Sequence, residues 1–291
     1  MQKLKQSYLN RMLQASMTSN EVNFILYLSH YQSEEGEIIG VYYKDVCDAL
    51  RISPQGFYDI LRALETKELL TWKKNNYYDV DIKLTDNDFT GYNYKNLNKG
   101  EGYINTNYQL FYSEAFLELR GPEKLLAMDF LKNYLAGKRS YAINVKRFVE
   151  KYRKLLGVTR RTLISYVKML KLFFSIGIKD GVYYITPLKA YREKNHRQEQ
   201  DIYEVHQFCV GLRRNRIKEV PKKDSKSMKD MLGLFKQYST YIKGFPHFNF
   251  SQVVYNMLEV INKEISNKYK WRRILNAALL NRELRLYLGL N

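Results

Sequence analysis

The chain has 291 residues, with 48 Lys and Arg against 30 Asp and Glu, which gives a formal net charge of +18 at pH 7. Hydrophobic residues make up 45% of it and only five residues are proline, so it can bury a core and is unlike a disordered basic tail. Its length suits two domains of about 100 residues each and an extension. A folded surface with this charge attracts polyanions, nucleic acid first and an anionic membrane surface second.

The sequence lacks the features of membrane-spanning, secreted and disulfide-rich proteins. No stretch approaches the ~18 to 20 apolar residues of a membrane span. The start, Met1-Gln-Lys-Leu-Lys-Gln-Ser, has no apolar block of a signal peptide, so we expect a cytoplasmic protein with no membrane partner. Cys47 and Cys209 are too few for a disulfide scaffold or a four-thiolate zinc site. Cys47 falls on the apolar face of an expected helix and is interpreted as a small buried thiol.

Motifs for catalysis and metal binding are also missing. The sequence has neither a Gly-x-x-x-x-Gly-Lys phosphate loop nor Gly-x-Gly-x-x-Gly, and its four histidines form no pair at a metal-binding spacing. His206 and Cys209 would share a helix face, but two ligands do not complete a zinc site. With 26 tyrosines, one near an arginine is expected by chance and does not indicate a nucleophile. We therefore expect no enzyme activity, no catalytic residue, no cofactor and no metal.

The first predicted module opens at Thr18-Ser-Asn-Glu21, the spacing of a capping box, and continues as a helix to about Tyr31. A short strand over 38–41 and a second helix over 43–50 follow. Ser53 and Pro54 then supply a hydroxyl cap and a first helical residue for a third helix that ends near residue 65. Two extended runs, 69–74 and 77–84, meet at Asn75-Asn76 as a hairpin. This order of elements is that of a winged helix.

The same order recurs 106 residues later. Residues 50–64 align with 156–170 at the turn, at the helix cap and at apolar positions of helical spacing, with Ser53 over Thr159. A second hairpin follows over 176–186, with Asp180-Gly181 suited to a tight turn. Upstream, residues 103–111 and helices over 113–119 and 122–135 would supply the remaining parts of this second module.

These patterns predict a mainly α protein with small β-hairpin wings. We expect a first winged-helix domain over 1–90, a second over 103–190, a charged linker or solvated helix over 191–230 and helices over 231–291. The boundary between the first two lies near 86–102. The last segment is either a small helical domain or an arm that packs on the second module.

The third helix of each module is expected to enter the major groove of DNA. In the second module the core face takes Leu163, Tyr166, Val167 and Leu170, which leaves Arg160, Arg161, Ser165 and Lys168 outward. Arginine is the commonest bidentate reader of guanine, so this helix is the preferred reader. In the first module Gln55 can pair with adenine, but Asp59 would lie close to phosphates. The candidate DNA-binding residues are Arg160, Arg161, Ser165, Lys168, Lys179, Gln55, Tyr58, Arg62, Lys73 and Lys74.

The hairpin residues Lys73, Lys74, Asn75, Asn76 and Lys179 are placed to touch phosphates without reading sequence. A further set of basic residues would extend the electrostatic footprint: Arg213, Arg214, Arg216, Lys222, Lys223, Arg272 and Arg273. Each of these side chains is equally compatible with an ordinary solvated surface.

Residues 50–70, Leu-Arg-Ile-Ser-Pro-Gln-Gly-Phe-Tyr-Asp-Ile-Leu-Arg-Ala-Leu-Glu-Thr-Lys-Glu-Leu-Leu, resemble the recognition half of bacterial winged-helix regulators, a likeness that extends over 18–84. Residues 103–131 look like the entry of the winged-helix domains in plasmid and phage replication initiators. The resemblance implies two such domains in one chain.

We therefore expect a protein that binds specific double-stranded DNA, most simply to regulate transcription in a bacterium or mobile element. The alternative is a plasmid or phage replication initiator that binds origin repeats. From a different class, the chain could be a scaffold whose winged helices dock proteins. For the C-terminal helices two alternative partners remain open, a second copy of the chain or another protein.

Overall fold

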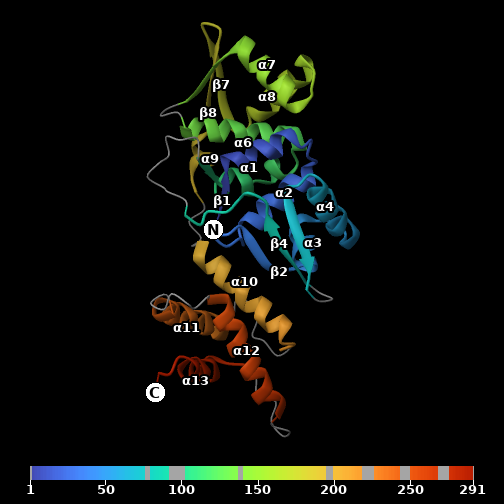
Figure 1. Cartoon of the computed structure of the whole chain (residues 1–291). Helices are drawn as coiled ribbons and strands as arrows, with labels where there is room; N and C mark the ends of the chain where they lie inside the picture. The colour runs from blue at the N-terminus through green and yellow to red at the C-terminus, as the bar shows by residue number, and fades with distance from the viewer. Residues whose placement is uncertain are drawn as a thin grey trace. The chain divides into compact units, whose positions relative to one another are not determined.

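The computed structural model describes residues 2–75, 79–91, 102–136, 140–194, 199–217, 226–242, 250–267 and 275–290 (Figure 1). The chain forms two compact units, Met1–Glu199 and Gln200–Asn291. It is mainly helical, and its strands form antiparallel sheets of two or three strands. The predicted class, mainly α with small β elements, is confirmed at this level.

The first half of the larger unit follows the order that its sequence predicts. Its elements are α2 (Ser19–Ser29), β2 (Glu37–Tyr42), α3 (Tyr43–Leu50), α4 (Pro54–Thr66), β3 (Leu70–Lys74) and β4 (Asp79–Leu84), and the sheet order is β2-β4-β3. The capping box is present, because Thr18 N donates to Glu21 Oε2 at 2.6 Å and Glu21 N to Thr18 Oγ1 at 3.3 Å. Ser53 Oγ accepts from Gly56 N at 3.0 Å and starts α4.

The second half repeats this arrangement. Its elements are α6 (Gly121–Ala136), β6 (Tyr141–Asn144), α7 (Val145–Leu156), α8 (Arg160–Leu170), β7 (Phe174–Lys179) and β8 (Val182–Pro187), with sheet order β6-β8-β7. Thr159 Oγ1 accepts from Thr162 N at 3.2 Å, as the aligned cap predicts. Asp180 and Gly181 have φ of 50° and 70°, the left-handed pair of a tight hairpin turn.

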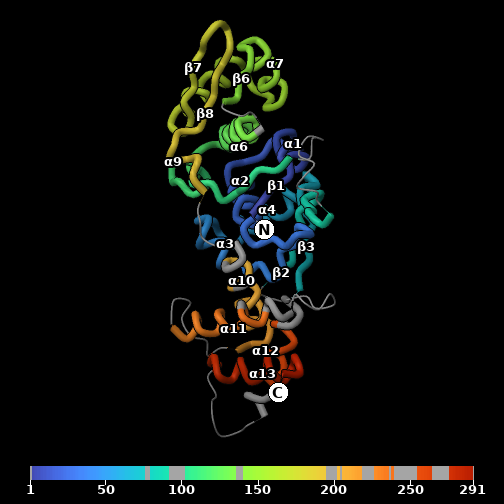
Figure 2. The backbone as a smooth tube through the Cα atoms, turned by 90° about the vertical axis from the view of Figure 1, so that its left-hand side faces the viewer, coloured from blue at the N-terminus to red at the C-terminus, as the bar shows by residue number. Residues whose placement is uncertain are grey.

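An N-terminal segment for which no helix or strand was predicted joins these halves. Strand β1 (Lys3–Lys5) pairs antiparallel with β5 (Tyr103–Asn105), with Leu4 opposite Ile104. Helix α1 (Gln6–Gln14) follows and contacts α6 and α7. On its other side, the Tyr8 hydroxyl donates to the Leu69 carbonyl at 2.9 Å. Figure 2 shows α6 lying between α1 and α2 on one side and the β6–β8 sheet on the other.

The two halves therefore differ from the expected pair of separate domains over 1–90 and 103–190. One continuous hydrophobic core runs from Leu4 to Ile185 through both halves. The physical reason is that α6 packs directly on α1 and on α2 and buries the apolar faces that a linker would leave apart. Two short elements, η2 (Gln109–Tyr112) and α5 (Glu114–Leu117), complete this core with Phe116.

The C-terminal unit is helical and has a core of its own. Its helices are α10 (Glu199–Arg214), α11 (Lys226–Ile242), α12 (Phe250–Asn267) and α13 (Ala277–Tyr287). Helix α10 buries Phe208 and Leu212 against α11 to α13. Of the linker or helix expected over 191–230, the described part 199–214 is a helix, but it is not purely solvated, since α10 supplies part of the second core. Before it, α9 (Lys189–Arg192) is a single turn of the larger unit, in which Tyr191 is partly buried against Phe173.

Candidate nucleic-acid interface

Helix α8 separates into a buried face and a basic face. Leu163, Tyr166, Val167 and Leu170 are buried, which is the core face that the sequence predicts. The outward residues of α8 include Arg160, Arg161, Ser165 and Lys168, all exposed. Within the described ranges, none of the three cationic side chains forms an ion pair with another residue. The helix therefore presents free cations on a rigid support.

A buried ionic cluster holds α7 against α6 and so sets the position of the α7–α8 pair. Asp129 on α6 accepts from the Tyr152 hydroxyl at 2.5 Å and from Lys151 Nζ at 2.9 Å, and its other oxygen lies 2.5 Å from Lys132 Nζ. Burial on its own would raise the pKa of Asp129, but the two lysines and the tyrosine hold that pKa below its usual value. Burial also raises the pKa of Tyr152, so this hydroxyl stays neutral and donates to the carboxylate.

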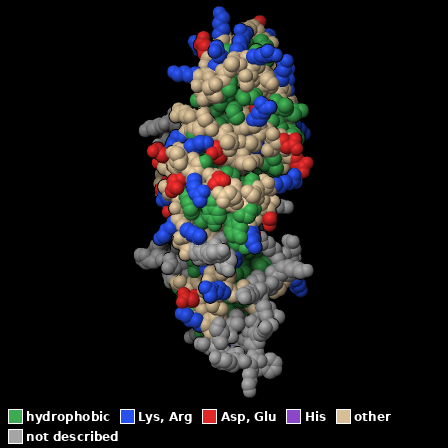
Figure 3. Space-filling model, turned by 90° about the vertical axis from the view of Figure 1, so that its right-hand side faces the viewer, with side chains coloured by type: hydrophobic (Ala, Val, Ile, Leu, Met, Phe, Trp, Pro, Cys, Tyr) green, Lys and Arg blue, Asp and Glu red, His purple; other side chains and the backbone are tan. Residues whose placement is uncertain are grey.

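Positive charge is concentrated in the second half. Residues 140–194 contain thirteen Lys and Arg against three Asp and Glu. Figure 3 shows the blue side chains gathered at the upper end, where Figure 1 places α7 and the β7–β8 hairpin. Helix α7 contributes a set that the sequence analysis missed, although its amphipathic spacing indicates it: Lys146, Arg147, Arg153 and Lys154, all exposed.

The second hairpin is tied to the same surface. Lys179 is exposed at the end of β7, directly before the Asp180-Gly181 turn. The Val145 amide at the start of α7 donates to the Gly181 carbonyl at 2.9 Å. This bond ties the hairpin turn next to Lys179 to the start of α7.

The corresponding surface of the first half is different, because its polar side chains engage one another. Asp59 Oδ1 accepts from Gln55 Nε2 at 2.8 Å and pairs with Arg62 at 3.3 Å. Tyr58 is partly buried, and its ring lies 6.4 Å from that of Trp72. The predicted readers of α4 thus make contacts within their own module, and Gln55 and Arg62 remain exposed.

The first hairpin and the net charge of its module also differ from those of the second half. Lys73 and Lys74 are exposed on β3, and Asn75 donates to Asp81 on β4. Asn76 lies outside the described residues. Residues 18–91 contain thirteen Asp and Glu against seven Lys and Arg, the opposite sign to the second half. Counting charge module by module would have revealed this difference from the sequence.

The remaining basic candidates fall in the C-terminal unit. Arg213 and Arg214 lie in the last turn of α10, where Arg214 stacks 5.7 Å from the Tyr255 ring centre, and Arg216 follows the helix as an exposed residue. The other four candidates, Lys222, Lys223, Arg272 and Arg273, lie outside the described residues. This unit therefore adds basic surface, with Arg214 partly engaged by an aromatic ring.

The part of the chain that the structure describes holds no group of three or more His, Cys, Asp or Glu side chains placed to bind a metal ion. His30 instead has a structural role. Its Nε2 lies 3.3 Å from the Thr106 carbonyl oxygen, and its ring stacks on Tyr112. Burial lowers the pKa of His30 to about 4. Cys47 is partly buried against the main core, and burial raises the pKa of its thiol. His196 and His247 are outside the described residues.

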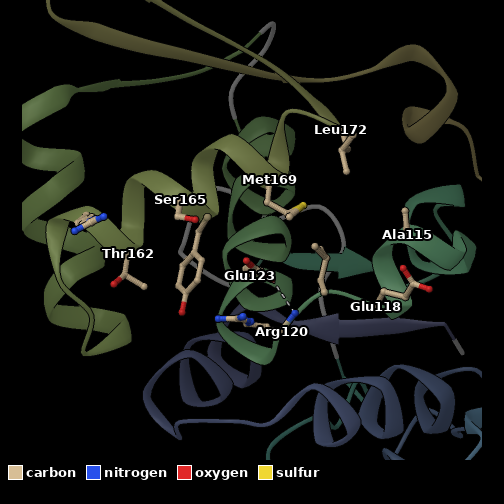
Figure 4. A pocket seen from close by; sticks show the side chains of 11 residues that line it. Ala115, Glu118, Arg120, Glu123, Thr162, Ser165, Met169 and Leu172 are labelled. Atoms are coloured by element: carbon tan, nitrogen blue, oxygen red, sulfur yellow. Dashed lines mark hydrogen bonds between the residues drawn. The ribbon is translucent and has the colours of Figure 1, made fainter.

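A groove of about 540 Å³ runs along one side of α8 (Figure 4). Its opposite wall is the chain from α5 to the start of α6, including Glu118, Arg120 and Glu123. Arg161 and Ser165 line the groove as well as belonging to the basic face. No sequence pattern indicates this groove, since its walls are more than 35 residues apart along the chain.

Among the described helices, none is both long and apolar enough to cross a membrane. Comparison of the chain with protein-family models, curated proteins and solved structures finds no match.

Proposed function

We propose that the segment from α6 to β8 is a winged-helix domain that binds double-stranded DNA and places α8 in the major groove. The observation that carries this proposal is the two-faced helix α8, with Arg160, Arg161 and Lys168 exposed and without ion pairs to described residues. The stretch 140–194 around it has thirteen basic and three acidic residues. The order helix, strand, helix, turn, helix, hairpin supports it, because this order presents the third helix to DNA.

The side chains take different roles in this proposal. Arg160 and Arg161 lie in the first turn of α8, where side chains reach base edges, and each can bind guanine O6 and N7 with two hydrogen bonds. Ser165 donates to a base or phosphate, and Lys168 binds phosphate. Lys179 on the hairpin and the exposed cations of α7 contact the DNA backbone, which sets affinity and register without reading sequence.

For the first module, from α2 to β4, we propose a second winged helix that contributes less to DNA affinity. Its acidic balance opposes approach to phosphates, and the contacts around Asp59 engage Gln55 and Arg62. These observations favour a protein-docking role for this module. The predicted contacts of Gln55, Tyr58, Arg62, Lys73 and Lys74 with DNA stay predictions.

Two biological roles follow from specific DNA binding. Regulation of transcription requires binding sites near promoters, and initiation of replication requires repeated sites in an origin. Two modules fused through one core suit a single asymmetric site on either kind of DNA. The position of the selected sites in the genome decides between them.

The test is selection of bound DNA from a random pool at near-physiological salt, comparing the wild type with Arg160→Ala plus Arg161→Ala. Both side chains are exposed, so the double variant should fold as the wild type does. We expect an enriched motif that the double variant loses.

Lys73→Ala plus Lys74→Ala is the matched control, because it removes the same charge from the first module. We expect it to retain the motif. Absence of any enriched motif in the wild type would exclude sequence-specific recognition and favour the protein-docking scaffold. A motif lost in the control and kept in the double variant would move the reading surface to the first module.

A further inference from the structure

The groove beside α8 has the size of a small-molecule site. Its volume of about 540 Å³ falls within the range of roughly 300 to 1,000 Å³ typical of ligand pockets. One wall is the side of α8 and the turn that follows it, and the other is the connection from α5 to α6. Both walls belong to the same compact unit, so the groove is a fixed feature of it.

Polarity changes from one end of the groove to the other. Along α8 it passes from Arg161 and Thr162 through Ser165 to Met169 and Leu172. Figure 4 shows Arg120 extending toward the Thr162 end and Ala115 lying nearer the Met169 and Leu172 end. One end therefore offers cations and hydroxyl groups, and the other offers apolar surface.

The apolar end is open to water. Met169 is 44% exposed and Leu172 is 56% exposed. Both side chains belong to a single groove, unlike apolar residues scattered singly over a surface. A ligand that covers them gains the free energy of removing this surface from water.

The polar end keeps a positive balance. Glu123 also lies there, but its Oε2 accepts the Arg120 amide at 2.8 Å and so caps the start of α6. Glu118 lies toward the other end, near Ala115 (Figure 4). Neither the Arg120 nor the Arg161 guanidinium forms an ion pair with a described residue. Tyr166 also lines the groove, and burial raises the pKa of its hydroxyl, so it stays a neutral donor.

From this arrangement we propose that the groove binds a small amphipathic anion. A carboxylate or phosphate head lies between Arg120 and Arg161, within reach of the hydroxyl groups of α8. An apolar body covers Met169 and Leu172. Binding at this site does not require that the protein binds DNA.

A consequence for DNA does rest on the proposed function. Arg161 and Ser165 belong both to the groove and to the face of α8 that we propose to read bases. The anion and DNA phosphates or bases compete for the same guanidinium. The ligand is therefore expected to weaken DNA binding, as an effector of a DNA-binding protein does.

The experiment uses the full chain with ¹³C-labelled methionine methyl groups, and octanoate and monooctyl phosphate as probes. The Met169 signal is assigned with Met169→Leu. We expect a saturable shift of this signal, with affinity falling about fourfold for each methylene removed on going to butanoate. The probe that binds more tightly, octanoate or monooctyl phosphate, shows whether the site prefers a carboxylate or a phosphate head group.

Two variants test the two ends of the ligand, and a third variant is the control. Arg120→Gln and Leu172→Asp should each weaken octanoate at least tenfold, since one removes the charge and the other the apolar contact. Both side chains are exposed, so the fold is expected to persist. Lys168→Ala is the control: it removes a cation from α8 that does not line the groove, and octanoate affinity should stay unchanged.

Three results would overturn the proposal: no saturable Met169 shift, equal affinity in Arg120→Gln, or binding of 1-octanol as tight as that of octanoate.

A separate titration measures DNA affinity with and without octanoate, in the wild type and in Arg120→Gln. If octanoate weakens DNA binding of the wild type but not of Arg120→Gln, the result supports competition between octanoate and DNA. If the wild type binds no DNA, the proposed function fails while the methyl shifts still decide the groove.

Discussion

The imidazole of His30 lies at the end of α2, where it contacts a segment more than 70 residues away in the sequence. Its Nε2 is 3.3 Å from the Thr106 carbonyl oxygen and 3.3 Å from the Tyr112 hydroxyl. Burial disfavours the charged ring and lowers its pKa from 6.5 to about 4. One side chain therefore links the stability of this region to pH.

We predict that this histidine makes the fold sensitive to mild acid. The unfolded chain takes up a proton near pH 6.5 and the folded chain only near pH 4, so stability present above pH 6.5 is lost as pH falls between these values. The loss approaches about 3 kcal/mol at pH 4. Urea unfolding from pH 7 to 4 measures it, with His30→Gln as the reference because glutamine does not titrate. Parallel pH profiles of the two proteins would contradict the prediction.

At the scale of elements, the position of α6 depends on a close backbone approach. A Cβ atom added at Gly121 would lie 2.0 Å from the Met17 carbonyl oxygen, in the turn between α1 and α2. Close by, Lys124 Nζ donates to Ser19 Oγ and Asn23 Oδ1 of α2 and to the Leu117 carbonyl, each at 2.7 Å. The absent side chain and the buried ammonium together hold the first turn of α6 against α2.

We predict that Gly121→Ala lowers the thermal unfolding temperature, although alanine has the higher helix propensity. The methyl group forces α6 away from the α1–α2 turn and disturbs the bonds of Lys124. Gly233→Ala on α11 is the control, since a Cβ there meets nothing within 4 Å. That substitution should stabilise its helix by about 0.5 to 1 kcal/mol. An unchanged or raised unfolding temperature for Gly121→Ala would show that the turn adapts without cost.

At the scale of the whole molecule, the two units have separate cores. The larger one buries residues from Leu4 to Ile185, and the smaller one buries residues from Phe208 to Leu284. Charge is distributed unevenly over them: 18–91 is acidic, while 140–194 and 200–291 are basic. If the protein binds DNA as proposed, long-range attraction is expected from both basic regions, and the proposed reading surface lies in only one of them.

We predict that residues 1–199 fold alone and select the same DNA motif as the full chain. Within the described ranges, the hydrophobic core of this unit is built from residues between Leu4 and Tyr191. Affinity should fall with weaker salt dependence, because 200–291 carries seventeen Lys and Arg against eight Asp and Glu. Circular dichroism and the random-pool selection check the two parts. An unfolded fragment, or one that selects another motif, would contradict the prediction.

Local chemistry explains which parts of this fold the sequence determined by itself. The caps at Thr18, Ser53 and Thr159 and the turn at Asp180-Gly181 depend on bonds between residues at most three positions apart. The buried face of α8 follows from helical spacing, and with it the outward position of Arg160 and Arg161. The net charge of each module also follows from the sequence, because it requires only a count of charged residues.

Contacts between distant residues decided the rest. Helix α1 has an apolar face at Tyr8, Leu9 and Met12, but only the packed structure shows that this face joins α6 and α7 while Tyr8 reaches Leu69. The same holds for the groove, whose walls come together only when α6 and α8 pack. Periodicity tells which face of an element is buried, whereas its partner depends on side-chain fit across the whole core, and so only the tertiary structure united the two modules in one unit.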